Sequence, residues 1–520
     1  MPFAAGSPPN PALAASRDLH LVAAGTGLGL FGSLFRQGIT ALTVLLLARL
    51  LPQRDFGLVQ LGISFVVLLS LVGKLGFDVV VTRFTAIHLA AGDLPRVKGV
   101  IYVGLFWAGL FSVLLAVATN FFAPGIARLF LKPDFAAPLR YFAWWIPALV
   151  LGTVSSGAIL ARGSARARVY VRDVLMPALY LLFALVALLL RPSAAAIGLA
   201  YTLSAFGGLA LALVYLRHSY PSLPSLRGLY EHGRLLAVGL PNMLTDLAST
   251  GLTQSDVVVV GRLLEAAHLG VYAAASHLSL LGTLPLSALN QIFSPVVSRL
   301  HHQGKTAELN YLLKTFSRLA LAAALPVLLI FAALARPLLG LLGPGFLEGA
   351  PVLLIASAGI LANVATGPVG YALVMAGYQW LAFANNLLFL GLLVAGMWWL
   401  TPTYGLIGAA TALATASALV NLVRLLLVHR LLRVNPLSLA MFKPLLAAAV
   451  AGGITNLGAR AAGLRGTEAL YLLLPAVVGF SLLGAGMYVG LLLALGIEPA
   501  DRQAAGAVWS RLRAQFRRGE

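Results

Sequence analysis

The chain has 520 residues, of which 60% are hydrophobic and only 10% are charged, and its formal net charge is +20. Soluble globular proteins carry about 25% charged residues, so this composition excludes a soluble protein and indicates lipid as the main solvent. A basic balance suggests nucleic acid in a soluble protein. In a membrane protein, however, lysines and arginines gather in cytoplasmic loops, so we expect a lipid bilayer and no nucleic acid as partner.

Residues 1–20 are rich in proline and alanine and contain a single arginine, Arg17. They lack the basic start, short apolar run and small-residue cleavage site of a secretory signal peptide. We therefore predict a disordered cytoplasmic tail at 1–20.

Apolar runs separated by basic or Pro/Gly turns follow this tail, and each approaches the roughly 20 residues that a spanning helix needs. They predict an all-α polytopic membrane protein with helices at 21–50, 57–90, 97–122, 137–161, 171–190, 195–216, 235–262, 269–297, 308–335, 349–376, 381–400, 404–430, 443–461 and 469–495. The second and eighth helices run on into amphipathic stretches at 78–91 and 294–302. We expect both to break or to emerge into a polar space.

An even number of spans places both termini on one side of the membrane. The loops on that side hold most of the basic residues, such as the four arginines between 162 and 172, so the positive-inside rule predicts cytoplasmic termini. The basic cytoplasmic tail at 496–520 has apolar residues at helical spacing within 509–518. That stretch is either an interfacial helix on anionic headgroups or a solvated basic tail.

Two short motifs recur along the chain. The spacing Arg49…Gly57 matches Arg262…Gly270, and a Pro…Ile-Gly spacing at 192–198 matches one at 402–408. The repeat predicts a six-helix lobe at 21–216, a second at 235–430, and two further helices at 443–495. Six helices per copy preserve orientation, so the lobes are parallel repeats, and in such transporters the substrate binds between the repeats near the midplane.

Basic residues inside the spans are the first candidates for a binding site, because a charge deep in a membrane is costly and usually functional. Arg36 lies well inside the first span, and Lys74 and Arg83 lie in the second. Arg262 ends the seventh span near the predicted outer surface, where interfacial anchoring is the simpler explanation. Lys74 and Arg83 could instead pair with Asp78 and fix the break in the second helix.

Acids are scarce, so those inside the spans are informative. Asp246 and Asp256 both lie in the seventh helix, with Asn242 and Gln254, and Asn242 and Asp246 share a face. They could couple transport to an ion or proton, or bind sugar hydroxyls. Alternatively, they form structural salt bridges to Arg36 or another basic residue. Asn290 in the eighth helix is a sugar contact or an interhelical hydrogen-bond partner.

The aromatic cluster YFAWW at 141–145 is typical of an interfacial belt, with sugar stacking as the alternative. The glycines at 25–32 follow no strand, and GKT at 304–306 lacks the first glycine of a phosphate-binding loop. We therefore expect no ATP site, no cofactor, no metal and no enzymatic activity. Energy would come from H⁺, Na⁺ or the membrane potential.

Three segments carry a resemblance to a known family: LARLLP at 47–52 followed by Phe-Gly at 56–57, GKLGFD at 73–78 followed by Arg-Phe at 83–84, and PTYGLIGAA at 402–410. Together they resemble the polysaccharide (oligosaccharide) flippases of the multidrug/oligosaccharidyl-lipid/polysaccharide exporter superfamily. The resemblance covers nearly the whole chain. It implies a V-shaped pair of lobes, alternating access, and translocation of undecaprenyl-diphosphate-linked oligosaccharide across the inner membrane. Polysaccharide polymerase and export machinery are the implied partners.

Such a substrate needs a wet cavity with cations for its diphosphate, and arginine suits phosphate because its planar fork bonds two oxygens. Two members of the same superfamily remain alternatives: a lipid-linked peptidoglycan precursor flippase and a cation-coupled multidrug exporter. A cationic interior disfavours the exporter. A membrane-embedded glycosyltransferase or polymerase is a further alternative, disfavoured by the short outer loops without paired carboxylates.

Overall fold

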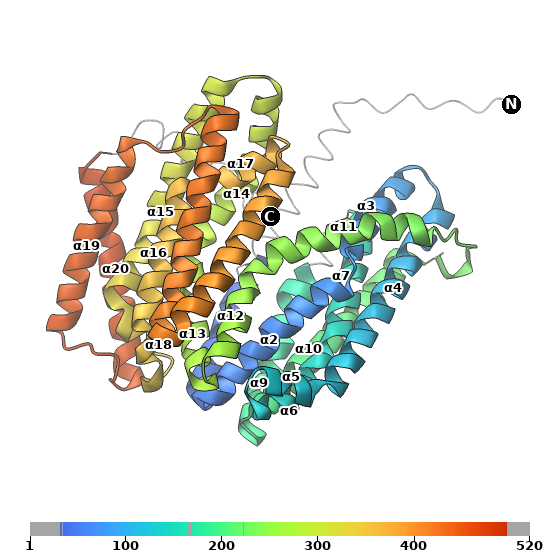
Figure 1. Ribbon diagram of the computed structural model, residues 1–520, viewed down its shortest axis with the longest axis horizontal. Helices are drawn as coiled ribbons and strands as arrows, with labels where there is room; N and C mark the ends of the chain where they lie inside the picture. The colour runs from blue at the N-terminus through green and yellow to red at the C-terminus, as the bar shows by residue number, and fades with distance from the viewer. Residues whose placement is uncertain (1–31, 34, 164–168, 222, 497–520) are drawn as a thin grey trace, which may run out of the picture.

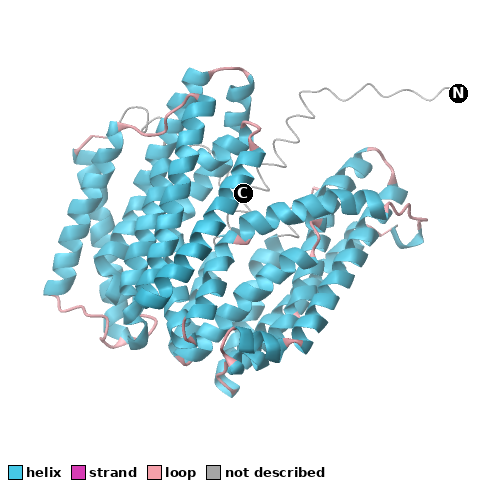
Figure 2. Cartoon of the chain, in the orientation of Figure 1, coloured by secondary structure: helices cyan, strands magenta, loops and turns pink. Residues whose placement is uncertain are grey.

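The computed structural model describes residues 32–33, 35–163, 169–221 and 223–496. All regular elements in these ranges are helical, joined by turns and loops at the helix ends (Figure 2). The prediction of an all-α polytopic protein is thereby confirmed. The predicted tail at 1–20, and the tail after Gly496 with its stretch at 509–518, lie outside the described residues.

The first half of the chain begins with a helix described over 35–50. It continues with α2 (Gln53–Gly73), α3 (Phe77–Ala90), α4 (Leu94–Phe121), α5 (Ala123–Leu129), η1 (Pro133–Phe135), α6 (Ala136–Ala143), α7 (Trp145–Ala161), η2 (Val169–Leu175), α9 (Met176–Leu190) and α10 (Ala194–Ser219). These elements, 35–219, form the N-lobe. A linker containing η3 (Leu223–Ser225) follows.

The second half forms the C-lobe, 232–432, and two appended helices. Its elements are α11 (His232–Thr250), α12 (Leu252–Leu263), α13 (Ala266–Ser279), η4 (Leu280–Thr283), α14 (Leu284–His302), α15 (Thr306–Gly340), η5 (Pro344–Gly349), α16 (Ala350–Thr366), α17 (Val369–Met375) and α18 (Gln379–Leu432). The chain then continues through η6 (Leu439–Met441), α19 (Phe442–Ala461) and α20 (Leu470–Ala494).

Helix α18 is a hairpin of two spans. Gly405 interrupts it with φ 57° and ψ −132°, a backbone conformation that only glycine adopts readily. Arg424 in the second half donates to the Asn386 side-chain oxygen in the first half at 2.9 Å. A straight helix would separate these residues by roughly 57 Å, at 1.5 Å per residue.

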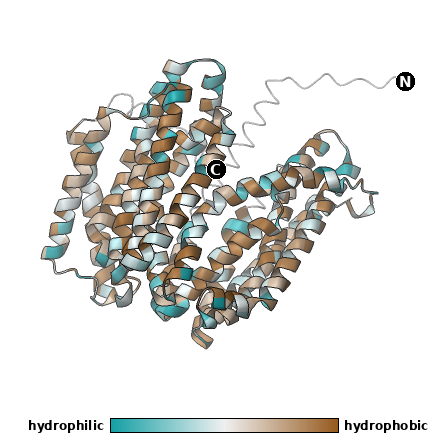
Figure 3. Ribbon diagram, viewed as in Figure 1, coloured by the Kyte–Doolittle hydropathy of each residue, from teal (hydrophilic) through white to brown (hydrophobic). Residues whose placement is uncertain are grey.

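Eleven described segments are long and apolar enough to cross a membrane. When the halves of α18 are counted separately and the α11–α12 pair is added, thirteen of the fourteen predicted spans are present. The described part of the remaining one, 35–50, is helical. Large apolar side chains such as Leu189 (85% exposed) and Leu482 (70%) are exposed on the outside, and Figure 3 shows that hydrophobic residues predominate along the helices. The chain is therefore a multi-pass membrane protein.

The predicted break of the second span is present: it is divided between α2 and α3, where Gly76 has φ 71°. The eighth span is instead interrupted by η4 at Leu280–Thr283, and α14 continues through the amphipathic stretch at 294–302, where the break was expected. The seventh span also divides, into α11 and α12 at Gly251, which the sequence analysis did not predict. Figure 1 shows the lobes joined at α2, α12 and α13 and set apart at the opposite end, where α11 crosses between them.

The repeated glycines form the contact between α2 and α13, which we call the glycine seam. A methyl group on Gly270 would lie 2.8 Å from the Gln53 carbonyl oxygen and 3.1 Å from the Gly57 nitrogen. Reciprocally, a methyl group on Gly57 would meet the Ala266 carbonyl oxygen and lie 3.0 Å from the Gly270 nitrogen. Equivalent residues of the two repeats thus contact each other across a pseudo-twofold axis, because only glycine lets the two backbones approach so closely.

A lysine from the N-lobe closes the same end of the molecule. Lys132, only 7% exposed, donates from Nζ to the carbonyl oxygens of Gly261 and Leu264 at the end of α12, the latter at 2.7 Å. These carbonyls have no partner within the helix, and a cation stabilises that end of a helix dipole. In the other direction, Arg49 donates to the Leu341 carbonyl oxygen of the C-lobe at 3.2 Å.

Candidate functional site

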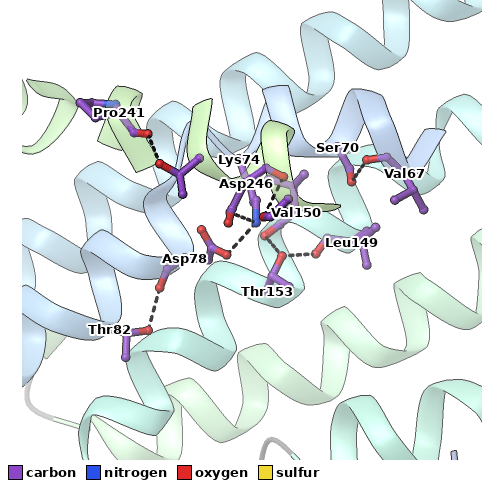
Figure 4. A network of polar contacts seen from close by, with 12 residues as sticks. Val67, Ser70, Lys74, Asp78, Thr82, Leu149, Val150, Thr153, Pro241 and Asp246 are labelled. Carbon is purple, nitrogen blue, oxygen red and sulfur yellow. Dashed lines mark hydrogen bonds and ion pairs between the residues drawn. The ribbon is translucent and has the colours of Figure 1, made fainter. Parts of the chain in front are cut away.

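Three charged side chains meet where the N-lobe contacts α11, and we call them the ionic triad: Lys74, Asp78 and Asp246. Lys74 Nζ lies 2.8 Å from Asp78 Oδ2 and 2.6 Å from Asp246 Oδ2. Figure 4 shows Lys74 pointing between the two carboxylates, one from its own lobe and one from α11. The triad therefore joins the two halves of the chain by charge.

The break in the second span places this triad. Lys74 follows the last residue of α2, and Asp78 lies in the first turn of α3, where a carboxylate is favoured by the helix dipole. A methyl group on Gly239 of α11 would lie 2.5 Å from the Leu75 carbonyl oxygen. The small residues at the break thus allow α11 close enough for Asp246 to reach Lys74.

The triad carries one positive and two negative charges, and its side chains are 14%, 24% and 26% exposed for Lys74, Asp78 and Asp246. Partly buried charges are stable only when they are paired. Because Lys74 already binds two carboxylates, an incoming anion can bind it by replacing Asp246. That exchange would weaken the attachment of α11 to the N-lobe, although other contacts, such as the hydrogen bond from Trp107 to His232 at 3.1 Å, would remain.

Arg36 forms a second ion pair inside the N-lobe. Its Nε donates to Asp173 Oδ1 at 3.0 Å, and the side chains are 43% and 14% exposed. Asp173 lies in η2, which is π-helical, and such segments often redirect side chains at functional sites. The pair uses Nε, which leaves the terminal nitrogens of the guanidinium for another acceptor.

A cavity of about 270 Å³ lies beside this pair. Its walls come from the first helix, α7, η2, α9 and α10, and they include Arg36, Trp145 and Tyr201. The cavity is thus inside one lobe. The predicted aromatic cluster divides here, since Trp145 is buried and lines the cavity while its neighbour Trp144 is 41% exposed.

The other predicted basic residues lie apart from the triad. The Arg83 guanidinium lies 5.8 Å from the Phe84 ring centroid, as does that of Arg234 on α11, so Arg83 does not join Lys74 at Asp78. Arg262 ends α12 near Lys132. It is roughly 24 Å along the helix from Asp246, by the rise per residue.

The remaining predicted polar residues separate in the same way. Asn242 donates to the Val238 carbonyl oxygen of its own helix at 2.9 Å. Gln254 accepts a hydrogen bond from Ser64 of α2 at 2.8 Å. Asp256 is buried and accepts from Tyr272 at 3.2 Å, and Asn290 is buried in α14. Of the acids and amides predicted in the seventh helix, Asp246 alone enters the triad.

Two charged residues within the predicted spans were not predicted as site candidates. Asp173 was missed although it lies within the span at 171–190, where an acid is as informative as Asp246. Arg424 was missed within the span at 404–430. It is half-buried and donates to the neutral Asn386 amide. None of the ion pairs among the described residues includes it.

A metal centre is not indicated in the described part of the chain, where no three histidine, aspartate or glutamate side chains are grouped in a way that could hold an ion.

Known proteins resemble this chain in sequence and in fold. The sequence model of a family described as polysaccharide biosynthesis protein matches residues 22–301. The succinoglycan biosynthesis transport protein ExoT of Rhizobium meliloti (strain 1021) is 27% identical over 345 residues, which are 63% of this chain and 64% of ExoT. The match thus spans slightly less than two thirds of that relative.

Two solved structures have a similar fold. The lipid II flippase MurJ, in an inward closed conformation, superposes with a TM-score of 0.67 at 14% identity, over 90% of this chain and 97% of that one. An inward-facing multidrug resistance MATE family transporter of the MOP superfamily superposes with a TM-score of 0.60 at 16% identity, over 77% and 98%. At these identities the likeness concerns the fold alone.

Proposed function

The chain belongs to the polysaccharide biosynthesis protein family, a family of membrane transporters, and from this membership we propose that it is a flippase for lipid-diphosphate-linked oligosaccharide. The substrate would be an undecaprenyl-diphosphate-linked repeat unit, moved across the inner membrane for a cell-surface polysaccharide. Its relative ExoT is named as a succinoglycan transport protein, which supports a saccharide cargo.

The observation that carries the proposal is the pairing of two cations within the membrane-spanning helices, Arg36 and Lys74, with carboxylates that an anion can replace. A diphosphate cannot cross hydrocarbon alone, because burying an unpaired charge is costly. Charge-assisted hydrogen bonds from Arg and Lys would substitute for its water. The prenyl tail can stay in the bilayer throughout.

In this proposal the lobes alternate between two arrangements. The glycine seam and Lys132 hold them together at one end, and Figure 1 shows them diverging at the other. With both termini cytoplasmic, the diverging end faces the cytoplasm and the arrangement is inward-facing. Diphosphate binding at Lys74 would displace Asp246 and free α11 to move with the C-lobe.

The other predicted residues keep proposed roles within this scheme. Arg83 and Arg262 are further phosphate contacts near the two membrane surfaces. Asp256, buried with Tyr272, is the candidate for coupling to H⁺ or Na⁺, the alternative being drive by the membrane potential alone. Asn242, Gln254 and Asn290 are candidates for sugar contacts. Polymerase and export machinery would receive the product.

The experiment is a flipping assay with the purified chain in proteoliposomes. A fluorescent undecaprenyl-diphosphate-linked sugar is reconstituted, and membrane-impermeant reductant reports the fraction in the outer leaflet over time. We expect transport by the wild type, loss in Arg36→Ala and partial recovery in Arg36→Lys. The matched control is Arg128→Ala, an exposed arginine at the end of α5.

Absence of flipping in the wild type would contradict the proposal, and wild-type rates in Arg36→Ala would remove Arg36 from the mechanism. The same assay with a lipid-linked peptidoglycan precursor and with a cationic dye tests the two alternatives. Transport of either in preference to the oligosaccharide lipid would replace the proposal.

A further inference from the structure

The N-lobe cavity beside Arg36 has a wall of three aromatic rings. The Trp145 and Tyr201 ring centroids lie 4.9 Å apart, and those of Tyr180 and Tyr201 lie 3.7 Å apart. The three rings come from α7, α9 and α10, and all three residues line the cavity. Rings held against one another from three helices form a preorganised surface.

One of the three aromatic residues carries a buried donor without a described partner. Trp145 Nε1 makes no hydrogen bond to any described residue, and it is shielded from the cavity as well. Leaving such a donor unpaired is costly, and buried indole N–H groups usually have a partner. A ligand oxygen satisfies this donor only when the Trp145 side chain turns toward the cavity.

Hydroxyl groups further along α7 offer the cavity hydrogen-bond acceptors. Thr153 donates to the Leu149 carbonyl oxygen at 2.6 Å, and Ser156 donates to the Gly152 carbonyl oxygen at 2.7 Å. Because their protons are engaged, these two oxygens can only accept. The cavity therefore presents hydroxyl acceptors and the Arg36 guanidinium beside an aromatic wall.

We propose that this cavity is a subsite for one sugar ring of the transported lipid, an inference that rests on the function proposed above. A sugar ring has an apolar face for the aromatic wall and hydroxyls that both donate and accept. The volume of about 270 Å³ is near the lower limit of ~300–1,000 Å³ for small-ligand pockets, and it fits one ring, not a whole repeat unit.

Other occupants fit less well. A prenyl or acyl chain would offer no polar atom to the terminal nitrogens of Arg36 or to the hydroxyl oxygens of Thr153 and Ser156. A cationic amphiphile would meet Arg36 and Arg172, both of which line the cavity, whereas none of the described lining residues is a carboxylate and the nearby Asp173 is already paired with Arg36. The subsite lies on the N-lobe side of the ionic triad: Thr153 on α7 precedes by one turn Gly157, which packs against the Asp78 backbone. A sugar in the cavity and a diphosphate at Lys74 can thus belong to one molecule.

The test measures binding of short lipid probes to the full chain in nanodiscs by isothermal titration calorimetry. The probes are farnesyl diphosphate and farnesyl diphosphate carrying glucose, galactose or N-acetylglucosamine. We expect at least one glycosylated probe to bind the wild type about 10-fold more tightly than farnesyl diphosphate. Trp145→Leu should remove that difference and leave farnesyl diphosphate binding unchanged.

Two variants keep the test interpretable. Trp145→Phe retains a smaller ring and so less of the aromatic wall. It should therefore reduce the sugar-dependent increment about 3-fold to 5-fold, and it decides the matter if Trp145→Leu does not fold. Trp144→Leu, at the exposed neighbour, is the matched control and should bind every probe as the wild type does.

The subsite is contradicted if the wild type binds every glycosylated probe no more tightly than farnesyl diphosphate, while binding farnesyl diphosphate itself. It is also contradicted if Trp145→Leu and Trp145→Phe weaken all probes equally. If the wild type binds none of the probes, the proposed function fails and the subsite fails with it.

Discussion

The glycine seam and the ionic triad are two contacts between the same halves of the chain, built on opposite principles. At the seam, equivalent residues of the repeats meet backbone to backbone, with Gly57 against Gly270. At the triad, Lys74 binds Asp78 and Asp246, and the repeat supplies no symmetric counterpart. Packing of backbones has no substitute, whereas an ion pair can exchange one anion for another. The seam therefore suits a structural joint and the triad suits a substrate-sensitive one.

The glycine seam should tolerate substitution less well than the ionic triad. Gly57→Val places a branched side chain against the Ala266 backbone, which cannot move aside as a side chain would. We expect a loss of at least about 3 kcal/mol, the upper range for overpacking, seen as a lower Tm and reduced monodisperse yield in detergent. Gly391→Val is the matched control, because nothing lies near its added methyl group. Equal Tm values for both variants would show that the seam is not tightly packed.

Disrupting the ionic triad should cost less stability than disrupting the glycine seam, and a second substitution should restore most of that stability. Lys74→Ala leaves two carboxylates facing each other, and we expect it to lower the free energy of unfolding by about 1–3 kcal/mol. Breaking a fully buried pair costs about 3–5 kcal/mol, but these carboxylates are partly exposed. Adding Asp246→Asn should recover most of the Tm but no transport. A Tm that stays low in the double variant would mean that Lys74 stabilises the fold by packing and not by charge.

The Arg36–Asp173 pair should contribute less to stability than the ionic triad does. The Arg36 side chain is 43% exposed, so Asp173→Asn should cost about 0.5–1 kcal/mol. The same change removes the competing carboxylate, so farnesyl diphosphate should bind more tightly to Asp173→Asn, and the gain should shrink at high salt. Weaker binding would indicate that Asp173 orients Arg36 for its ligand. Asp134→Asn, at an exposed pair with Arg54, is the control.

The smallest expected effect is the pH dependence of the contact between Lys132 and the end of α12, at the same end of the molecule as the glycine seam. Burial, together with the nearby Arg262 guanidinium, lowers the pKa of Lys132 to about 8, whereas a lysine released into water has a pKa near ~10.4. Lys132 therefore loses its proton at a lower pH in the closed arrangement, where it is buried, than in an open one. Raising the pH from 7 towards 10 should favour closure at the seam, because the cost of burying the charge disappears; below pH 7 no further change is expected.

This pH effect is measurable by spin labelling, since the chain contains no cysteine. Labels at Ala86→Cys on α3 and Tyr371→Cys on α17 report the distance between the diverging ends of the lobes. The population of the long distance should rise between pH 7 and pH 9.5, and Lys132→Met should make the profile flat. An unchanged shift in Lys132→Met would assign the titration to another group.

The fold was largely predictable because its signals are local. Runs of apolar residues identify a span without reference to any other span, and the repeat of Arg49…Gly57 at Arg262…Gly270 identified the lobes. The break after Lys74 was predicted from the amphipathic stretch that follows it. The kink at Gly251 was not, because an isolated glycine within an apolar run is compatible with a straight helix.

The candidate site was less predictable. Arg36 and Lys74 were found because charges within spans are rare, and the same rule applied to every acid would have found Asp173. No rule of this kind separates Trp144 from Trp145, which are neighbours in the sequence but differ in burial. Nor does it show that Asp246 binds Lys74 while Asp256 is buried with Tyr272.

The sequence by itself thus determined that the chain is an all-α protein that spans a membrane and carries charged side chains inside its spans, because hydropathy and charge are properties of each residue. Its repeat predicted two related lobes. The tertiary structure alone decided which charges pair, since Arg36 could have met any carboxylate in the membrane and contacts one that is 137 residues away. It also decided that the repeated glycines contact each other. Pairing depends on how each helix is rotated and how closely its neighbour approaches, and both are set by the packing of the whole bundle.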